Sequence, residues 1–210
     1  MKQKDVPAVN RDQIVRAALA LIDREGLDRF NLAGVAGQVG ITAASLYYHV
    51  ADKADLLASV ARHLLEGAAR SMPARRGSWA EVLIATSLDV RRSILRHPKA
   101  APLLLQYPPR HLVAEGYERS LLMLEAAGVS KSDALQICIG MEHITWGSTL
   151  LAAAALSSGL PPLPSLDPTQ VEGLAGSRRK ADEALFLRTC RAFLAGFAAK
   201  DASADGRDPS

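Results

Sequence analysis

The stretch that decides the fold reads Gly40-Ile41-Thr42-Ala43-Ala44-Ser45-Leu46-Tyr47-Tyr48-His49-Val50, and Ala51-Asp52-Lys53 follows it. Because glycine accepts a left-handed backbone, Gly40 can end one helix, and the hydroxyl of Thr42 can then cap the next. That next helix begins near Ala43 and is about two turns long, with Leu46 pointing back into the domain. Two short helices that meet at a tight turn in this way predict a helix-turn-helix.

The tip of the second helix carries small side chains, which allow a helix to approach a groove of DNA closely. The tip consists of Thr42, Ala43, Ala44 and Ser45. Alanine methyl groups suit the methyl group of thymine, and hydroxyls bond to base edges or phosphates. Since the tip has no arginine, asparagine or glutamine, we expect modest base discrimination that relies partly on water and on DNA shape. The next two aromatic residues, Tyr47 and Tyr48, either extend their phenol hydroxyls toward phosphates or cover a small core.

The pattern around this stretch adds a helix from Asn10 to Glu25, a helix-ending Gly26 and a short helix after Asn31. Together with Leu46-Tyr47-Tyr48-His49-Val50, Lys53 and Leu56-Leu57, it resembles the DNA-binding head of the TetR family of bacterial transcriptional repressors. The resemblance covers Asn10 to about Leu57. It implies that the DNA contacts come from Asn31, Thr42, Ala43, Ala44, Ser45, Tyr47, Tyr48, His49 and Lys53.

One position departs from the family pattern. Members usually place a hydroxyl residue and then an arginine or similar polar residue at the start of the second helix, where this chain has Asn31-Leu32-Ala33-Gly34. The side chain of Ala33 has no polar group that could reach DNA, so one expected DNA contact is lost. Lys53 lies unfavourably at the positive end of its helix dipole, and a phosphate partner would reverse that cost. The other interpretation of Lys53 is a solvated lysine.

Charge and composition limit the classes of function. The net charge is +3, and residues 1–70 hold nine Lys and Arg against eight Asp and Glu, so DNA affinity must come from the placement of groups such as Arg11 and Lys53. No apolar run approaches the roughly 18 residues of a membrane span, and the polar start is unlike a signal peptide, so we expect a cytoplasmic protein with no membrane contact. Cys138 and Cys190 lack metal-binding spacing and are predicted to be buried thiols; we expect no metal and no cofactor.

The remaining chain predicts an all-α fold, in which an N-terminal helix-turn-helix head joins a helical ligand-binding and dimerisation body. Residues 1–57 form the arm and the DNA-binding domain, with its core at 10–57. Residues 58–200 form the effector-binding and dimerisation domain, with 58–70 as a linking helix, and 201–210 form a disordered tail. Further helices are expected from Trp79 to His97, Lys99 to Gln106, His111 to Ala127, Ser130 to Ser157 and Arg179 to Ala199.

Small residues on the last two helices predict close helix packing, and the resemblance implies a homodimer built on them that binds a palindromic operator. They include Gly140, Gly147, Ala192 and Gly196. The resemblance also implies a pocket for a small apolar or amphipathic effector that releases the repressor from DNA. We place this pocket near Leu103, Tyr107, Met123, His143 and Trp146. A histidine on an apolar helix is also compatible with a purely structural core position.

The main hypothesis is therefore a homodimeric repressor that an effector releases from DNA. An activator and a regulator controlled by a protein partner remain open. An all-helical enzyme is disfavoured, because the chain has no HExxH, GxSxG or phosphate-loop motif and its one adjacent acid-base pair, Glu142-His143, points in two directions on a helix. A helical scaffold with no DNA role is compatible with the nearly neutral head.

Overall fold

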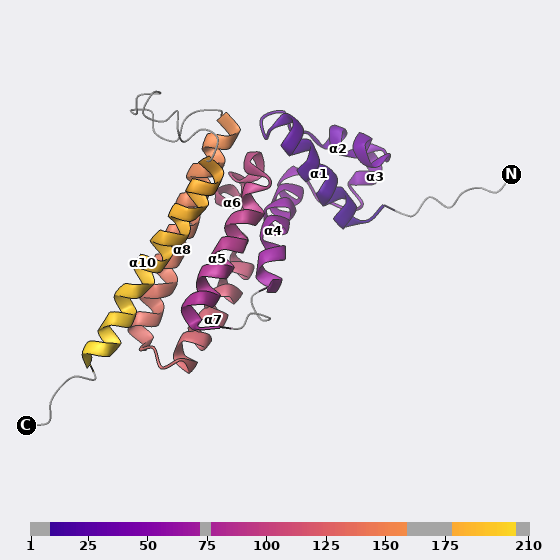
Figure 1. Cartoon of the computed structure of the whole chain (residues 1–210). Helices are drawn as coiled ribbons and strands as arrows, with labels where there is room; N and C mark the ends of the chain where they lie inside the picture. The colour runs from indigo at the N-terminus through magenta and orange to yellow at the C-terminus, as the bar shows by residue number, and fades with distance from the viewer. Residues whose placement is uncertain (1–8, 72–76, 159–177, 205–210) are drawn as a thin grey trace, which may run out of the picture.

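The computed structural model describes residues 9–71, 77–158 and 178–204, and these residues form helices without any β-strand (Figure 1). The head consists of α1 (Arg11–Glu25), α2 (Leu32–Val39) and α3 (Ala43–Leu46), and α4 (Lys53–Ser71) leads from the head into the body. The body contains α5 (Trp79–Leu95), the 3-10 helix η2 (Pro98–Ala100), α6 (Leu103–Gln106), α7 (Arg110–Ala126), α8 (Lys131–Ser158) and α10 (Arg178–Ala204). The expected all-α fold is confirmed.

The helix starts follow from local capping chemistry. Asn10 and Gln13 form a reciprocal capping box at α1, and Ser78 and Glu81 form another at α5. The Ser130 hydroxyl accepts a hydrogen bond from the N–H of Asp133 at the start of α8. Each cap satisfies backbone N–H groups that would otherwise lack a partner.

Two helix boundaries differ from the sequence prediction. The helix expected from Lys99 to Gln106 is split into η2 and α6, because Pro102 has no N–H and its ring obstructs the carbonyl four residues earlier. The prediction that the disordered tail begins at residue 201 is wrong for residues 201–204, which continue α10. Alanine favours helix, and no glycine or proline occurs between Gly196 and Gly206. The expected N-terminal arm (residues 1–8), the proline-containing segment 160–166 and the tail at 205–210 lie outside the described residues.

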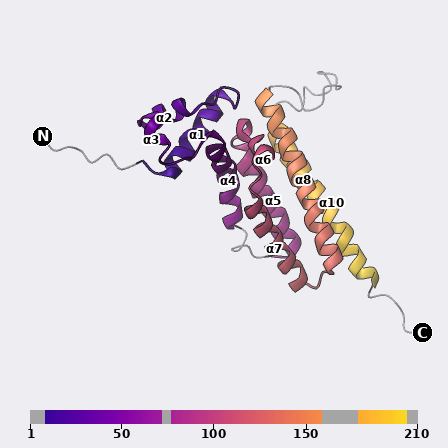
Figure 2. The ribbon, with the colours of Figure 1, turned by 180° about the vertical axis from the view of Figure 1, so that it is seen from behind.

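The body is a layered bundle that extends away from the head (Figures 1 and 2). α5 packs between α4 and α8, and α10 runs along α8 on the side of the body far from the head. One buried cluster joins head to body, because it contains α1 and α4 residues such as Ile14 and Val60 together with Ile94 of α5 and Leu103 of α6. Head and body therefore share a continuous core through α4.

Polar contacts reinforce this junction between head and body. The Nδ1 atom of His97 lies 2.6 Å from Oδ2 of Asp23 on α1, and Lys99 donates a hydrogen bond to the carbonyl of Arg24. On the α4 side, the Ser93 hydroxyl donates to the carbonyl of Leu64 over 2.6 Å. The α5–η2 corner thus contacts both α1 and α4.

A second buried cluster holds α8 and α10 together and contains both cysteines. Cys138 is 7% exposed and Cys190 is 0% exposed, among neighbours such as Ile137 and Phe186. Burial disfavours the thiolate and raises the pKa of each thiol to about 11. The prediction of buried thiols is confirmed.

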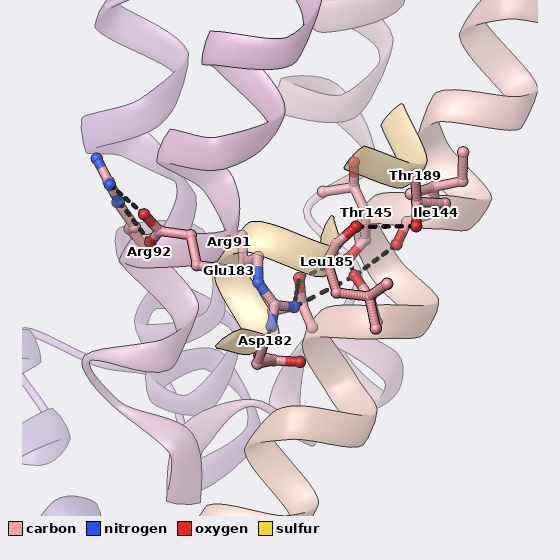
Figure 3. A network of polar contacts seen from close by, with 10 residues as sticks. Arg91, Arg92, Ile144, Thr145, Asp182, Glu183, Leu185 and Thr189 are labelled. Atoms are coloured by element: carbon pink, nitrogen blue, oxygen red, sulfur yellow. Dashed lines mark hydrogen bonds and ion pairs between the residues drawn. The ribbon is translucent and has the colours of Figure 1, made fainter. Parts of the chain in front are cut away.

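A buried arginine links α5 to both of these helices (Figure 3). Arg91 is 1% exposed and forms an ion pair with Asp182 of α10, while its NH1 atom lies 3.2 Å from the Ser148 hydroxyl and 3.4 Å from that of Thr149. Its guanidinium also lies 5.1 Å from the ring centroid of Phe186. Because a buried charge is costly without partners, these contacts fix the start of α10 against α5 and α8.

Candidate nucleic-acid interface and ligand cavity

The turn between α2 and α3 has the geometry that the sequence predicts. Gly40 has φ 75 and ψ 29, in the left-handed region, and the N–H of Ile41 donates to the carbonyl of Ala36 over 3.0 Å. Thr42 then caps α3, because its Oγ1 accepts a hydrogen bond from the N–H of Ser45 over 3.1 Å. The α2 start is fixed in the same way by Asn31, whose side chain accepts from the N–H of Gly34.

The side chains of α3 divide into one buried anchor and an exposed outer face. Leu46 is 0% exposed, whereas Tyr47 is 57% and Tyr48 is 90% exposed. The alternative in which these tyrosines cover a small core is therefore wrong. Thr42, Ala43 and Ala44 are exposed as well. A large aromatic side chain that stays almost wholly in water buries little apolar area in the chain itself, which favours a contact with another molecule.

The two expected cations of the head are engaged in contacts inside it. The Nζ atom of Lys53 donates to the carbonyl of Phe30 over 3.0 Å and lies 5.5 Å from the centroid of its ring. Since an ammonium has three donors, this bond leaves Lys53 able to bind a phosphate as well. Arg11 donates to the carbonyl of half-buried His49, to Asp55 over 2.5 Å and to the Ser59 hydroxyl over 2.9 Å. Arg11 therefore positions the end of the exposed segment against α4.

Asp55 completes this arrangement at the start of α4. Its Oδ2 accepts a hydrogen bond from the N–H of Ala51 over 2.9 Å, and its Oδ1 accepts from Arg11. These bonds, the backbone bond first and the Arg11 bond second, hold the pKa of Asp55 below its usual value. Asp52 caps the same helix, because its Oδ1 accepts a hydrogen bond from the N–H of Asp55. The segment from Tyr47 to Asp52 is thus fixed at both ends.

Two further polar side chains of the head are exposed. Arg29 precedes the cap of α2, and Gln38 lies near the end of α2. The sequence did not single them out as site residues, although each lies two residues before a capping or turn residue, Asn31 and Gly40.

The body contains a partly open cavity of about 160 Å³ between α4, α5, α7 and α8. Its wall is largely apolar, with a minority of hydroxyl, guanidinium and carboxylate groups. The lining residues that matter for its chemistry are Leu83, Val90, Met141 and Trp146 among the apolar ones, and Tyr117, Arg119, Glu142 and Thr145 among the polar ones. A concave, mostly apolar site with a few polar groups is typical of small-molecule binding.

The structure brings Trp146 to this cavity but not the other residues of the expected pocket. Leu103 is 0% exposed in the core that joins head and body, and Tyr107 packs against the same core. Met123 packs against the second core, and His143 is exposed on the outer face of α8. Because α8 is apolar almost all round, its sequence pattern did not reveal which face lines the cavity.

The polar groups of the cavity differ in how well they are paired. The Tyr117 hydroxyl donates a hydrogen bond to Glu142, and burial, followed by that bond, raises the pKa of Tyr117. By contrast, Nη1 of Arg119 lies 3.7 Å from Glu115, which also contacts His111. Among the residues that the structure describes, neither the buried Nε of Arg119 nor the buried hydroxyl of Thr145 has a hydrogen-bond partner.

The described residues contain neither a candidate membrane span nor a candidate metal-binding cluster. None of the helices in ranges 9–71, 77–158 and 178–204 combines the length and apolarity needed to cross a membrane. Over the same ranges, no group of three or more His, Cys, Asp or Glu side chains is arranged to hold a metal ion.

The fold and these two sites define an all-helical protein with a helix-turn-helix head and a ligand-sized cavity in its body. Comparison with known families agrees with this description: the profile of the bacterial regulatory proteins of the tetR family matches residues 14–60, and that of the tetracyclin repressor-like C-terminal domain matches residues 72–190. The chain belongs to the TetR family and is a transcriptional regulator of that family.

Individual relatives extend the likeness over most of the chain. The tetracycline repressor protein class D of Escherichia coli is 29% identical over 197 residues, which cover 90% of this chain and 89% of that protein. An HTH-type transcriptional regulator of Saccharopolyspora erythraea is 33% identical over 146 residues, which cover 68% of this chain and 60% of that protein. A crystal structure of a possible TetR family regulator from Streptomyces coelicolor superposes with a TM-score of 0.72 and 25% identity, over 90% of this chain and 99% of that one.

Proposed function

We propose that this protein is a homodimeric transcriptional repressor that binds a palindromic operator and is released from it by a small molecule bound in the body cavity. Regulators of this family are generally DNA-binding proteins without enzymatic activity. The observation that carries the proposal is the exposed outer face of α3, where Tyr48 is 90% exposed beside the small residues Ala43 and Ala44. In this arrangement the tip of α3 enters the major groove, and the phenol hydroxyls bind phosphates.

The proposed dimer contact lies on the outer faces of α8 and α10. On α8, Leu135 is 48% and Ile139 is 39% exposed on one face one turn apart, and Leu151 is 71% exposed further along the helix. Leu185 of α10 is 53% exposed. Large apolar side chains exposed on both helices favour burial against a second copy, which also brings two heads to the two halves of an operator.

The proposed release works through α4, which is part of both sites. Leu65 of α4 lines the cavity, and the neighbouring Leu64 accepts the hydrogen bond of Ser93. At its other end, α4 begins at Lys53, directly after the proposed DNA-binding face. A ligand releases DNA only if it binds the DNA-incompetent arrangement of α4 more tightly than the competent one.

The test is fluorescence anisotropy with duplexes that tile the DNA upstream of the protein's own gene, at two salt concentrations and with competitor DNA. We expect one duplex to bind tightly, with an affinity that falls as salt rises by a slope of about −0.9 per phosphate contact in the log–log plot. Tyr48→Ala should weaken binding about tenfold or more, because each head loses a hydrogen bond to a charged phosphate.

A matched control removes another exposed large side chain that is far from the head. Leu122 of α7 is 61% exposed, and Leu122→Ala should leave DNA affinity unchanged. Equal binding of Tyr48→Ala and the wild-type protein would contradict the proposed interface. Binding to every duplex with equal affinity would contradict a specific operator among the sequences tested.

A further inference from the structure

The cavity contains an unusual pair of polar groups on a mainly apolar wall. Nε of Arg119 and Oγ1 of Thr145 are buried and lack hydrogen-bond partners among the described residues. They come from different helices, α7 and α8, and both residues line the cavity. Because a buried donor without a partner is costly, such groups are rare in a native structure unless something else satisfies them.

Arg119 is the cation that lacks a close anion. Its only ion-pair contact within the described chain is Glu115 at 3.7 Å, and Glu115 also lies 3.0 Å from Nε2 of His111. The other ionic group on the wall, Glu142, already accepts the hydrogen bond of Tyr117. The guanidinium of Arg119 is therefore available to a ligand in the cavity, whereas the carboxylate of Glu142 is already paired with Tyr117. An anion with acceptor oxygens matches the guanidinium, because Arg pairs strongly with carboxylates.

The size of the cavity and its apolar lining restrict the rest of the ligand. Its volume of about 160 Å³ is well below the 300–1,000 Å³ that is usual for drug-sized ligands. An apolar cavity of about 150 Å³ accommodates a benzene ring. Met141 and Trp146, which line this one, make favourable contacts with an aromatic ring.

We propose that the cavity binds a single-ring aromatic carboxylate, with the ring on the apolar wall and the carboxylate on the guanidinium of Arg119. Arg119 retains 33% side-chain exposure, whereas Thr145 is 6% exposed, so the anionic end lies near the mouth and Thr145 lies deeper. The Thr145 hydroxyl, on the same helix as Ile144 in Figure 3, binds a hydroxyl substituent of the ring. This inference names the effector class for the release proposed above and rests on that proposal only for the effect on DNA.

The test uses isothermal titration of the full-length protein with benzoate, benzamide and benzylamine, which share one ring and differ in charge. We expect benzoate to bind about tenfold or more tightly than benzamide, because a charge-assisted hydrogen bond replaces a neutral one. In Arg119→Gln the preference for benzoate over benzamide should disappear. The control Arg110→Gln removes the same charge from an exposed position on the same helix, outside the cavity, and should keep the preference.

Each other result overturns a stated part of the inference. Tighter binding of benzylamine means that Glu142 selects the ligand. Equal binding of benzoate and benzamide means that the charge of the ligand does not determine its affinity. Absence of binding by all three at millimolar concentration rejects a ring-sized ligand, and a preference retained in Arg119→Gln rejects Arg119 as the partner. For Thr145, hydroxybenzoate isomers are compared: we expect one isomer to bind more tightly than benzoate in the wild type but not in Thr145→Val.

The same samples separate this inference from the proposed function. If benzoate binds as expected but the operator complex persists, the ligand class stands and the release mechanism fails. If a neutral or cationic molecule releases DNA while benzoate does not bind, the release mechanism stands and the ligand class fails.

Discussion

Gly140 allows α8 to pack closely on α10. The local geometry determines how far its replacement would lower the free energy of unfolding. A Cβ atom at Gly140 would lie 2.1 Å from Cζ of Phe193 and 2.7 and 2.8 Å from two other ring carbons. Carbon atoms in contact are about 3.5–4.0 Å apart, so the ring must move by more than an ångström. Phe193 also packs edge-on against Phe197, with the ring centroids 5.3 Å apart, which resists that movement.

Gly140→Ala should therefore lower the free energy of unfolding. Overpacking of this kind costs about 1–3 kcal/mol, and the severity of the overlap places the cost in the upper half of that range. Alanine regains about 1 kcal/mol of helix propensity, which leaves a net destabilisation of about 1–2 kcal/mol. The assay is urea denaturation followed by circular dichroism at one fixed protein concentration, because a dimer's apparent stability depends on concentration.

Two variants make this prediction decisive. A Cβ at Gly116, in the middle of α7, meets no atom within 4 Å, so Gly116→Ala should stabilise the protein by about 0.5–1 kcal/mol. Phe193→Leu removes the clashing ring end, so Gly140→Ala should cost less in that background than in the wild type. If Gly140→Ala is as stabilising as Gly116→Ala, the observed contact between α8 and Phe193 is not present in solution.

Three further substitutions test the polar contacts of the head and the body. Asp182→Asn should lower the free energy of unfolding by about 2–4 kcal/mol in urea melts, because it leaves the charge of Arg91 buried, and adding Arg91→Met should recover much of that loss. Asp55→Asn should cost about 1 kcal/mol at pH 7. Since the folded-state pKa of Asp55 is lowered, its contribution is complete above the unfolded-state pKa and disappears as the pH falls through the folded-state pKa. The melts of wild type and variant should therefore begin to converge only when the pH falls below about 4. Thr42→Ala should cost about 1 kcal/mol through the lost α3 cap, and Thr42→Ser, which keeps a capping hydroxyl, should cost less.

Local signals were sufficient to predict most of the head. Asn10, Asn31 and Thr42 each cap a helix through a bond to a nearby backbone N–H, and Gly40 adopts the left-handed conformation that its place in the sequence requires. These features depend on residues within a few positions of each other. Tyr48 was ambiguous in the sequence, because an aromatic side chain next to a short helix fits a core as well as a surface; only its packing environment decided that it is exposed.

Local sequence patterns were not sufficient to predict which residues of the body line the cavity. His143 and Trp146 are three positions apart on α8, yet His143 is exposed and Trp146 lines the cavity. Exposed Leu151 on the same helix shows why the pattern was ambiguous: α8 carries apolar residues on more than one face. The rotation of α8 is set by its contacts with α7, which precedes it in the chain, and with α5 and α10, which lie further away in the sequence. Arg119 was missed for the same reason, since its significance comes from missing partners and not from a motif.

The central claim is that two copies of the exposed α3 face read one palindromic operator. Hydroxyl-radical footprinting of the wild-type protein on the upstream duplex it binds most tightly tests this claim directly. We expect two protected patches related by two-fold symmetry, with their centres about one helical turn, 10–10.5 base pairs, or a longer spacing apart, and both patches lost together in Tyr47→Ala plus Tyr48→Ala. A single asymmetric patch, or a footprint that survives the double substitution in a protein that remains folded, would contradict the account.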